Sequence, residues 1–201
     1  MKDSKPRISQ ENVLKFIEQQ PPHIKYFLAE IPVGGGKSPV GINLSGYLAN
    51  SVGDAFVLTP QKILQKQYQD SFTPEQLFSL YGKSNYKCEP KQTNCSVGSD
   101  IKPRCEFCPH KSALAKARNS PNIVLNYTLG LILFSNPSLK FTKRKLMVMD
   151  ECHTLEHHLT EFRALQIGER RCRQFRVDWK VPKDELAALT WIREKYEPAV
   201  N

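Results

Sequence analysis

Residues 30–38 read Glu-Ile-Pro-Val-Gly-Gly-Gly-Lys-Ser, a stretch that predicts a phosphate-binding loop followed by a helix. Residues without a β-carbon let the chain curl tightly and point its N–H groups at phosphate oxygens. Lys37 would then reach the β- and γ-phosphates of a nucleotide, and the Ser38 hydroxyl would ligate Mg²⁺. The glycines expected at the phosphates are Gly34, Gly35 and Gly36.

The surroundings of this loop favour a nucleotide site but leave one alternative. The expected helix would point its positive end at the phosphates. Pro39 fits the first turn of this helix, because proline lacks a backbone N–H and the N–H groups of a first turn have no partner within the helix. The apolar stretch from Tyr26 to Ile31 predicts the strand that must precede the loop. A strict loop pattern requires glycine where this chain has Ile31. The alternative is a glycine-rich turn that opens an ordinary helix.

A second stretch, residues 147–153, reads Met-Val-Met-Asp-Glu-Cys-His. The apolar run that ends at Met149 predicts a buried parallel strand. Asp150 would hold Mg²⁺ at the end of this strand, and Glu151 would orient and deprotonate an attacking water. His153 would face the nucleotide. The alternative is an acidic, solvated helix N-terminus, but the upstream phosphate loop favours an ATP-hydrolysing pair.

Four cysteines between these two stretches predict a metal centre. They have six, nine and two residues between successive members: Cys88, Cys95, Cys105 and Cys108. Four thiolates in one segment suit either a tetrahedral Zn²⁺ or a [4Fe–4S] cluster, and spacing alone does not choose between them. His110 could replace one thiolate in a zinc site, although a surface position is the more ordinary expectation. Cys152 and Cys172 lack partners at ligand spacing and are expected to be small, inert thiols.

The charge of the chain indicates a nucleic-acid partner. The formal net charge is +9, and residues 62–145 carry the whole excess, with 14 basic and 5 acidic residues. Phosphate backbones bind such surfaces through the release of counterions. Tyr81, Tyr86 and Phe107 are interleaved with these charges and could stack on unpaired bases. The alternative is a basic, solvated face with buried aromatic rings.

Strands and helices alternate in the predicted secondary structure. Strands are expected at residues 26–31, 55–59, 123–125 and 146–149, and helices at residues 10–20, 61–69 and 112–119. A further helix is expected after the phosphate loop, within residues 26–50 that also hold the first strand and the loop. This alternation predicts a parallel, three-layer α/β core of RecA type. Apolar residues show no regular spacing in residues 82–109, which predicts an inserted loop domain. Beyond residue 154 no strand pattern is clear, and residues 184–196 predict a helix.

Together these motifs resemble the iron–sulfur helicases of superfamily two, the XPD and DinG group. Their phosphate loop typically reads Glu-Ala-Pro-Thr-Gly-Thr-Gly-Lys-Thr, which is similar to residues 30–38 and has no glycine at the position of Ile31. Their acidic motif is Asp-Glu-Ala-His, and this chain has Cys152 in place of alanine. Three further stretches look similar to family elements: Arg7 to Gln10, Leu58-Thr59-Pro60 with Leu64 and Gln67, and Asn122 to Tyr127.

The resemblance implies features that the residues alone do not. Gln10 would sit near the adenine, and the cysteine segment would hold [4Fe–4S] rather than Zn²⁺. Residues 1–81 and 111–160 would form the two parts of a first RecA-like domain, with residues 82–110 as the cluster insertion and 161–201 as the start of a helical Arch. A second RecA-like domain, in the same or another chain, would supply an arginine finger, so the chain is expected to be a fragment or a partial chain.

The sequence therefore predicts an ATP-dependent DNA helicase, for which the resemblance implies 5′ to 3′ polarity. Its expected partner is single-stranded DNA or DNA with a single-stranded tail. The runner-up is a metal-stabilised nucleic-acid-binding module with a degenerate nucleotide site, whereas a small-molecule kinase would leave the cysteines unexplained. No signal peptide is visible, and the longest apolar stretch, residues 123–134, is too short for a bilayer, so we expect a cytoplasmic or nuclear protein and no membrane partner.

Overall fold

The computed structural model describes residues 7–32, 34–49, 53–98, 101, 107–136, 141, 144–163 and 167–200. The chain divides into two compact units, Met1–Phe162 and Arg163–Asn201. Within the described ranges, no helix combines the length and the apolar character that crossing a bilayer requires.

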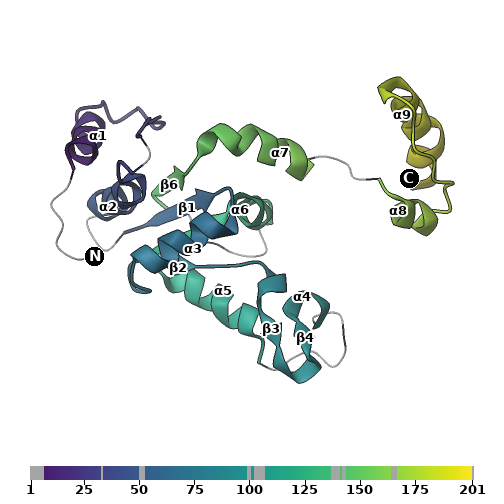
Figure 1. The fold of residues 1–201 in the computed structure, drawn as a ribbon, viewed down its shortest axis with the longest axis horizontal. Helices are drawn as coiled ribbons and strands as arrows, with labels where there is room; N and C mark the ends of the chain where they lie inside the picture. The colour runs from purple at the N-terminus through teal and green to yellow at the C-terminus, as the bar shows by residue number, and fades with distance from the viewer. Residues whose placement is uncertain are drawn as a thin grey trace. The chain divides into compact units, whose positions relative to one another are not determined.

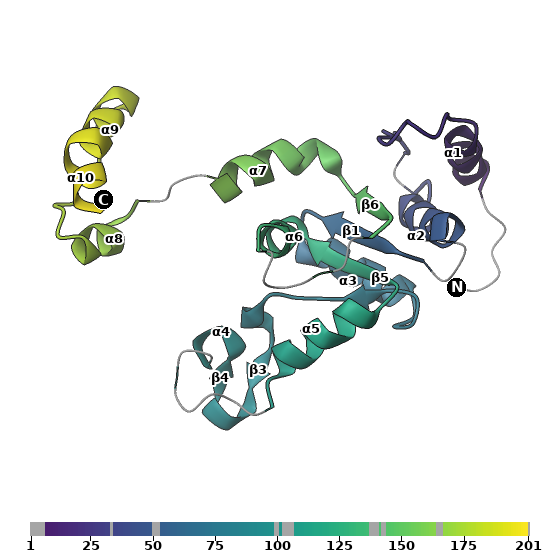
Figure 2. The same ribbon diagram turned by 180° about the vertical axis from the view of Figure 1, so that it is seen from behind.

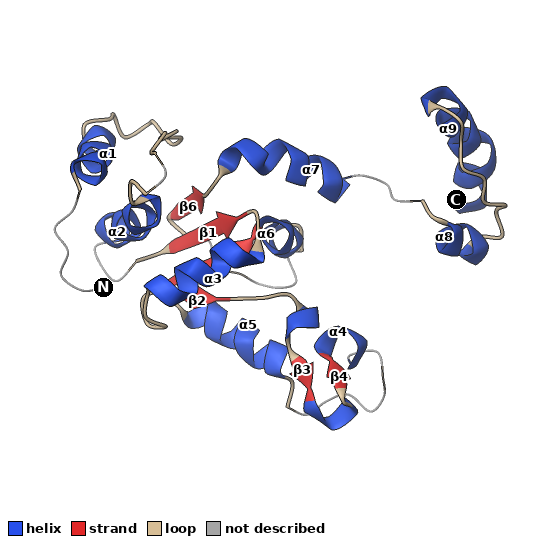
Figure 3. Ribbon diagram, in the orientation of Figure 1, coloured by secondary structure: helices blue, strands red, loops and turns tan. Residues whose placement is uncertain are grey.

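A four-stranded parallel sheet forms the centre of the first unit (Figures 1 and 3). Its strands lie in the order β2-β5-β1-β6, and β1 pairs in parallel with both β5 and β6. Parallel neighbours require crossover connections, and helices lie in those crossovers. The α/β core with a parallel sheet is therefore confirmed. The strand bounds are Ala55–Thr59 for β1, Phe78–Ser79 for β2, Asn122–Asn126 for β5 and Leu146–Met149 for β6.

Helices cover both faces of this sheet. Successive residues of β1 point to opposite faces, so Phe56 and Leu58 pack with residues of α5 and α6, whereas Val57 packs with residues of α2 and α3. In Figure 1 α3 lies in front of the sheet, and in Figure 2 it lies behind. All five residues of β1 are buried, as a central parallel strand requires. The bounds are Lys37–Ala49 for α2, Lys62–Ser71 for α3, Pro109–Asn119 for α5 and Tyr127–Phe134 for α6.

Two further helices belong to the first unit. α1 (Ile8–Glu18) packs beside α2, and α7 (Leu155–Arg163) follows the turn after β6. The predicted helices at residues 10–20, 61–69 and 112–119 form close to their expected bounds, and the helix expected between the phosphate loop and residue 50 also forms. α5 begins earlier than predicted, at Pro109, because the first turn of a helix needs no N–H donor there.

The strand predicted at residues 26–31 is absent. These residues have no regular structure, and Tyr26 is 91% exposed. A strand requires a neighbour that satisfies its backbone groups, and this apolar run has none in the described sheet. β6 is also less buried than predicted, since Met147 and Met149 are 42% and 39% exposed. The reason is that β6 lies at the edge of the described sheet, with β1 on one side only.

The cysteine-rich segment between β2 and α5 is built from very short elements. An antiparallel hairpin pairs β3 (Lys87–Cys88) with β4 (Thr93–Asn94), and α4 (Cys95–Gly98) follows it. Two 3-10 turns, η1 (Lys83–Asn85) and η2 (Glu89–Lys91), complete its described part. Strands of two residues are too short to show an alternation of apolar and polar residues, so the sequence did not predict this hairpin.

The second unit is helical over much of its described length. It contains α8 (Glu169–Gln174), α9 (Glu185–Trp191), the π-helical turn η5 (Ile192–Tyr196) and α10 (Glu197–Val200). The helix predicted at residues 184–196 therefore forms, with a π-helical end that periodicity does not reveal. The Trp191 ring packs against the rings of Trp179 and Tyr196. Assignment of this unit to an Arch stays a prediction.

The side chain of Asn122, the first residue of β5, forms hydrogen bonds with three other segments. A substitution of Asn122 therefore tests how much these bonds contribute to stability. Its Oδ1 accepts hydrogen bonds from Ser45 Oγ at 2.7 Å and from the Ala55 N–H at 3.0 Å, and its Nδ2 donates to the Gln76 carbonyl at 2.8 Å. Asn122→Ala is expected to lower the free energy of unfolding in urea by about 1–3 kcal/mol, because buried polar groups lose their partners. Asn119→Ala, at the exposed end of α5, is the control and should change it by less than about 0.5 kcal/mol. Equal stabilities of the two variants would contradict this role.

Candidate functional site

The predicted phosphate loop forms a tight turn directly before α2. Gly34 and Gly36 have φ angles of +77° and +85°, in the left-handed region that residues with a β-carbon rarely adopt. A β-carbon at Gly36 would lie 2.2 Å from Gln10 Nε2. Because α2 begins at Lys37, the positive end of its dipole lies at the turn, as an anion site requires.

Two side chains of α1 support this loop. Ser9 Oγ donates to the Gly35 carbonyl at 3.2 Å, and Gln10 Nε2 donates to the Gly36 carbonyl at 3.0 Å. Gln10 Oε1 in turn accepts from the Arg7 N–H at 2.9 Å. α1 thus holds loop carbonyls, and these bonds do not occupy the N–H groups that would bind phosphate.

The acidic pair lies on the turn that follows β6. The Asp150 N–H donates to the Leu58 carbonyl at 2.9 Å, which anchors this turn to the end of β1. Glu151 has a φ of +52°, a costly conformation for a residue with a β-carbon. Such conformations persist only where the surrounding structure holds them, and they concentrate at functional sites. The backbone of Glu151 is therefore consistent with a functional role for this turn, although Gln92 and Arg176 also have positive φ angles.

An ion pair joins the loop to this turn. Lys37 Nζ lies 2.9 Å from Glu151 Oε1, and His153 Nδ1 lies 3.5 Å from Glu151 Oε2. The hydrogen bond from Lys37 lowers the pKa of Glu151, and the same bond raises the pKa of Lys37 against the opposing effect of burial. Both groups are therefore charged near neutral pH, and each partly neutralises the other.

Asp150 is the more buried carboxylate of the pair. Burial raises the pKa of Asp150, the negative charge of Glu151 adds to this rise, and the positive charge of Lys37 opposes it. A divalent cation beside this carboxylate would offset the cost of holding it ionised in a half-buried position. The site therefore has the electrostatic character that a magnesium ligand needs.

Two buried tyrosines lie close enough to Asp150 to feel its charge. The Tyr68 ring, from α3, packs in the apolar core, and the negative charge of Asp150 adds to the rise that burial gives the pKa of Tyr68. Tyr127 Oη donates to the Asp150 carbonyl at 2.9 Å. Burial raises the pKa of both tyrosines well above the usual range, so both hydroxyls keep their protons. Sequence patterns did not reveal Tyr68, because a tyrosine on the inner side of an amphipathic helix looks like any other core residue.

The structure gathers the predicted nucleotide-site residues around one loop and one turn, and their roles as ligands stay predictions. His153 is the most exposed of the residues at the acidic turn. The residues gathered there are Gln10, Gly34, Gly35, Gly36, Lys37, Ser38, Asp150, Glu151 and His153.

The hairpin β3–β4 and the helices beside it carry three of the four predicted thiolate ligands. Cys95 Sγ and Cys108 Sγ are 4.0 Å apart. Cys88 is buried and packs so closely on Gly98 that a β-carbon there would lie 2.8 Å from its sulfur. Cys105 lies outside the described residues. Within the part of the chain that the structure describes, no group of three or more His, Cys, Asp or Glu side chains is arranged to hold a metal.

The start of α5 shapes the surroundings of Cys108. Burial disfavours its thiolate, but the N–H groups of Lys111 and His110 and the Cys95 thiol outweigh burial, so the pKa of Cys108 is lowered. His110 is buried rather than at the surface, which corrects the sequence-based expectation. Its ring packs edge-on against Tyr86 with centroids 5.4 Å apart, because the first turn of α5 covers that tyrosine.

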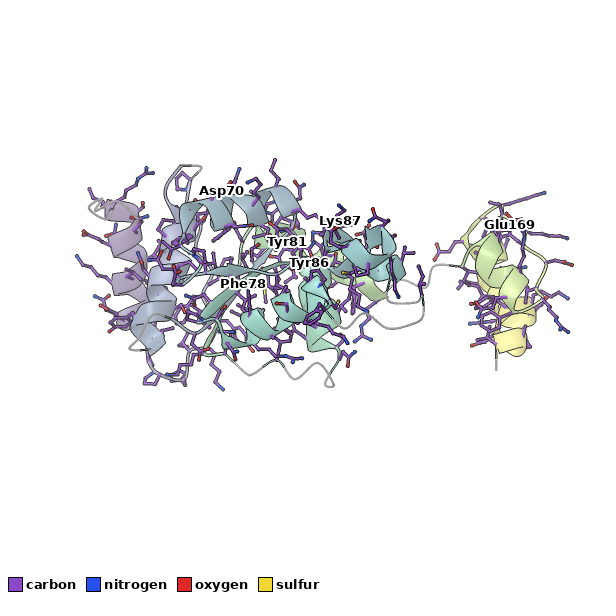
Figure 4. All side chains as sticks on the ribbon, turned by 90° about the horizontal axis from the view of Figure 1, so that it is seen from below. Asp70, Phe78, Tyr81, Tyr86, Lys87 and Glu169 are labelled. Carbon is purple, nitrogen blue, oxygen red and sulfur yellow. The ribbon has the colours of Figure 1, made fainter. Side chains whose placement is uncertain are left out.

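The three aromatic residues of the basic segment differ in exposure. Phe107 is 86% exposed. Tyr86 is half-buried, packs on His110, and its Oη accepts from the Tyr81 N–H at 3.2 Å (Figure 4). Tyr86 thus follows the alternative of a buried aromatic ring, whereas Phe107 is the most exposed of the three.

A family model described as type III restriction enzyme, res subunit, matches residues 3–176. The chain belongs to this family. The match identifies an N-terminal domain of a superfamily-two helicase and supports a nucleic-acid helicase or ATPase function. The comparisons with curated proteins and with solved structures find no match. The broad part of the predicted resemblance is confirmed, and membership of the XPD and DinG group stays a prediction.

Lys37→Ala is expected to weaken binding of Mg·ATP by at least about 30-fold, the equivalent of about 2 kcal/mol, because a charged partner of the phosphates is lost. Titration with a fluorescent ATP analogue measures the affinity, and circular dichroism checks the fold. Lys66→Ala is the matched control, since Lys66 pairs with Asp70 on the exposed surface of α3 and should bind ATP as the wild type does. Equal affinities of the wild type and Lys37→Ala would refute the assignment of the loop.

Proposed function

We propose that the chain is the first RecA-like domain of an ATP-dependent, iron–sulfur DNA helicase that moves 5′ to 3′. The contact between Lys37 and Glu151 carries the proposal, because it joins a phosphate loop to a carboxylate that can activate water. Membership of the helicase family supports the motor activity. The polarity and the cluster rest on the resemblance to the XPD and DinG group.

The resting ion pair suggests how the site responds to ATP. Lys37 would leave Glu151 to bind the β- and γ-phosphates, and Glu151 would then become free to accept the proton of the attacking water. Until that exchange, the bond to Lys37 lowers the pKa of Glu151 and keeps it a weak base. Ser38 and Asp150 would hold Mg²⁺, which supplies positive charge to the phosphates during transfer. His153, beside Glu151, would relay the nucleotide state to the DNA.

The basic cysteine-rich segment is the proposed DNA-binding surface. Lys83 and Lys87 are exposed, and Lys87 pairs with the equally exposed Glu89 at 3.4 Å, whereas Lys91 donates to the Gly98 carbonyl at 3.0 Å. Phe107 would stack on an unpaired base. This combination of cations with an exposed ring suits single-stranded DNA, or DNA with a single-stranded tail, bound without regard to sequence.

The four cysteines of this segment would hold the metal centre. The resemblance implies [4Fe–4S], in which each thiolate binds a different iron. Zn²⁺ is the alternative, since four thiolates also suit a single tetrahedral ion. The sulfurs of Cys95 and Cys108 lie 4.0 Å apart, so these two thiols are already close together. In either form the centre would tie the hairpin to α5, which is a structural contribution.

A second RecA-like domain would complete the motor. Transfer of the phosphoryl group in this class needs an arginine from that domain, worth about 10³–10⁵ in rate. We therefore propose that residues 1–201 bind Mg·ATP, hydrolyse it very slowly and separate no strands. The second domain would lie in the same or in another chain.

The proposal requires that nucleotide changes the affinity for DNA. Fluorescence anisotropy with a labelled single-stranded oligonucleotide should show binding that weakens with salt and that changes by at least about 5-fold when Mg·ATP binds, the lower end of usual coupling between sites. Lys37→Ala should keep its nucleotide-free affinity and lose this response, while Lys66→Ala responds as the wild type does. A nucleic-acid-binding module with a degenerate nucleotide site, the runner-up, would show no response in any variant.

The metal centre has its own test. Anaerobically purified protein is expected to be brown, and Cys108→Ser should lose the broad visible absorbance because one cluster ligand is gone. Cys172→Ser, in the second unit, is the control and should keep the colour. Colourless protein with stoichiometric zinc would establish the zinc alternative. Protein without metal from either source would contradict the proposed centre.

A further inference from the structure

Two consecutive residues of α1 hold two consecutive carbonyl groups of the phosphate loop. Ser9 Oγ donates to the Gly35 carbonyl at 3.2 Å, and Gln10 Nε2 donates to the Gly36 carbonyl at 3.0 Å. Each bond joins residues that are 26 positions apart in the sequence. The loop is therefore held from one side by α1, in addition to its own turn, in which the Gly35 N–H donates to the Pro32 carbonyl at 2.9 Å.

The planar geometry of the peptide bond converts these two contacts into an orientation for the loop N–H groups. In a trans peptide the carbonyl and the N–H that follows it point in opposite directions. The Gly35 carbonyl faces Ser9, so the Gly36 N–H points away from that side chain. The Gly36 carbonyl faces Gln10, so the Lys37 N–H points away as well. Both N–H groups lie at the start of α2, where a phosphate would meet them.

Both ends of the Gln10 amide are engaged within the protein. An amide pairs with the edge of an adenine through one donor and one acceptor that face the same way. In Gln10 the acceptor Oε1 takes the Arg7 N–H at 2.9 Å, and the donor Nε2 faces the Gly36 carbonyl. A backbone N–H only donates and a carbonyl only accepts, so the amide cannot be turned over without the loss of both bonds. Gln10 is thus committed to the loop and to the first turn of α1.

We propose that Ser9 and Gln10 are positioning residues of the phosphate loop, and that Gln10 serves recognition of the triphosphate rather than of the base. The inference rests on the proposed nucleotide site and deepens it, because it assigns the ligand class as nucleoside triphosphates held through their phosphates. It departs from the position near the adenine that the resemblance to the XPD and DinG group implies for Gln10. The N–H groups that α1 orients would meet the phosphates of ATP, GTP and inorganic triphosphate alike.

Replacement of Gln10 separates the two roles, because inorganic triphosphate has no base. Isothermal titration calorimetry in the presence of Mg²⁺ measures the affinity of the 201-residue chain for ATP, GTP and inorganic triphosphate. Gln10→Ala is expected to weaken all three by the same factor, about 3- to 10-fold, the equivalent of one hydrogen bond. Gln20→Ala is the matched control, since it removes a glutamine that donates to the Phe16 carbonyl, 3.1 Å away at the far end of α1.

Ser9→Ala separates the positioning of the loop from the stability of α1. Alanine favours a helix more strongly than serine, so this variant keeps α1 stable while it removes the bond to the Gly35 carbonyl. We expect a uniform loss of affinity for the three ligands, about 2- to 5-fold, with no fall in the melting temperature. Wild-type affinity in Ser9→Ala would mean that α1 acts only through folding, and would overturn the positioning role.

The remaining outcomes distinguish this inference from the proposed function. A loss in Gln10→Ala that is confined to ATP would show that Gln10 reads the base, and would overturn the inference while the ATP site stands. Unchanged affinities in Gln10→Ala would overturn it too, as would a wild type that binds ATP but neither GTP nor inorganic triphosphate. A wild type that binds none of the three ligands would overturn the proposed function as well.

Discussion

The parallel pairing of β1 with β5 and β6 is the interaction on which the rest of the site depends. Parallel strands end at the same edge of a sheet, so the chain leaves β1, β5 and β6 on one side of the molecule. The hydrogen bond from the Asp150 N–H to the Leu58 carbonyl continues this pairing past the end of β6 and fixes the start of the acidic turn. Tyr127, directly after β5, reaches the same turn through the Asp150 carbonyl. The site is thus assembled at the ends of three neighbouring strands.

Charge balance explains the state of this site without nucleotide. Asp150 and Glu151 place two carboxylates on one turn, and Lys37 is the cation that compensates them. The left-handed backbone of Glu151 turns its side chain to where Lys37 can reach it. In the proposed cycle, ATP would take Lys37 for its phosphates and bring Mg²⁺ to Asp150, so the same charges would be balanced by different partners. One loop lysine would then control both the binding of ATP and the basicity of Glu151.

The parts of the structure that could be predicted are those that depend on the order of apolar residues and glycines within a few neighbouring positions. The apolar runs at β1, β5 and β6 and the glycines before Lys37 each carry their own signal. The run at residues 26–31 carried the same apolar signal and formed no strand, because apolar character does not supply a pairing partner. Tyr68 and His110 were missed for a related reason: what each side chain does depends on neighbours that are distant in sequence. The hairpin β3–β4 is too short to leave a pattern.

The central claim is that the glycine loop and the acidic turn form one Mg·ATP site whose resting state is the ion pair between Lys37 and Glu151. A crystal structure of the chain with Mg²⁺ and a non-hydrolysable ATP analogue tests it most directly. The account predicts Lys37 Nζ on the β- and γ-phosphates, Mg²⁺ beside Ser38 and Asp150, and Glu151 released from Lys37 toward the γ-phosphate. Phosphates bound elsewhere, with the pair between Lys37 and Glu151 intact, would contradict it.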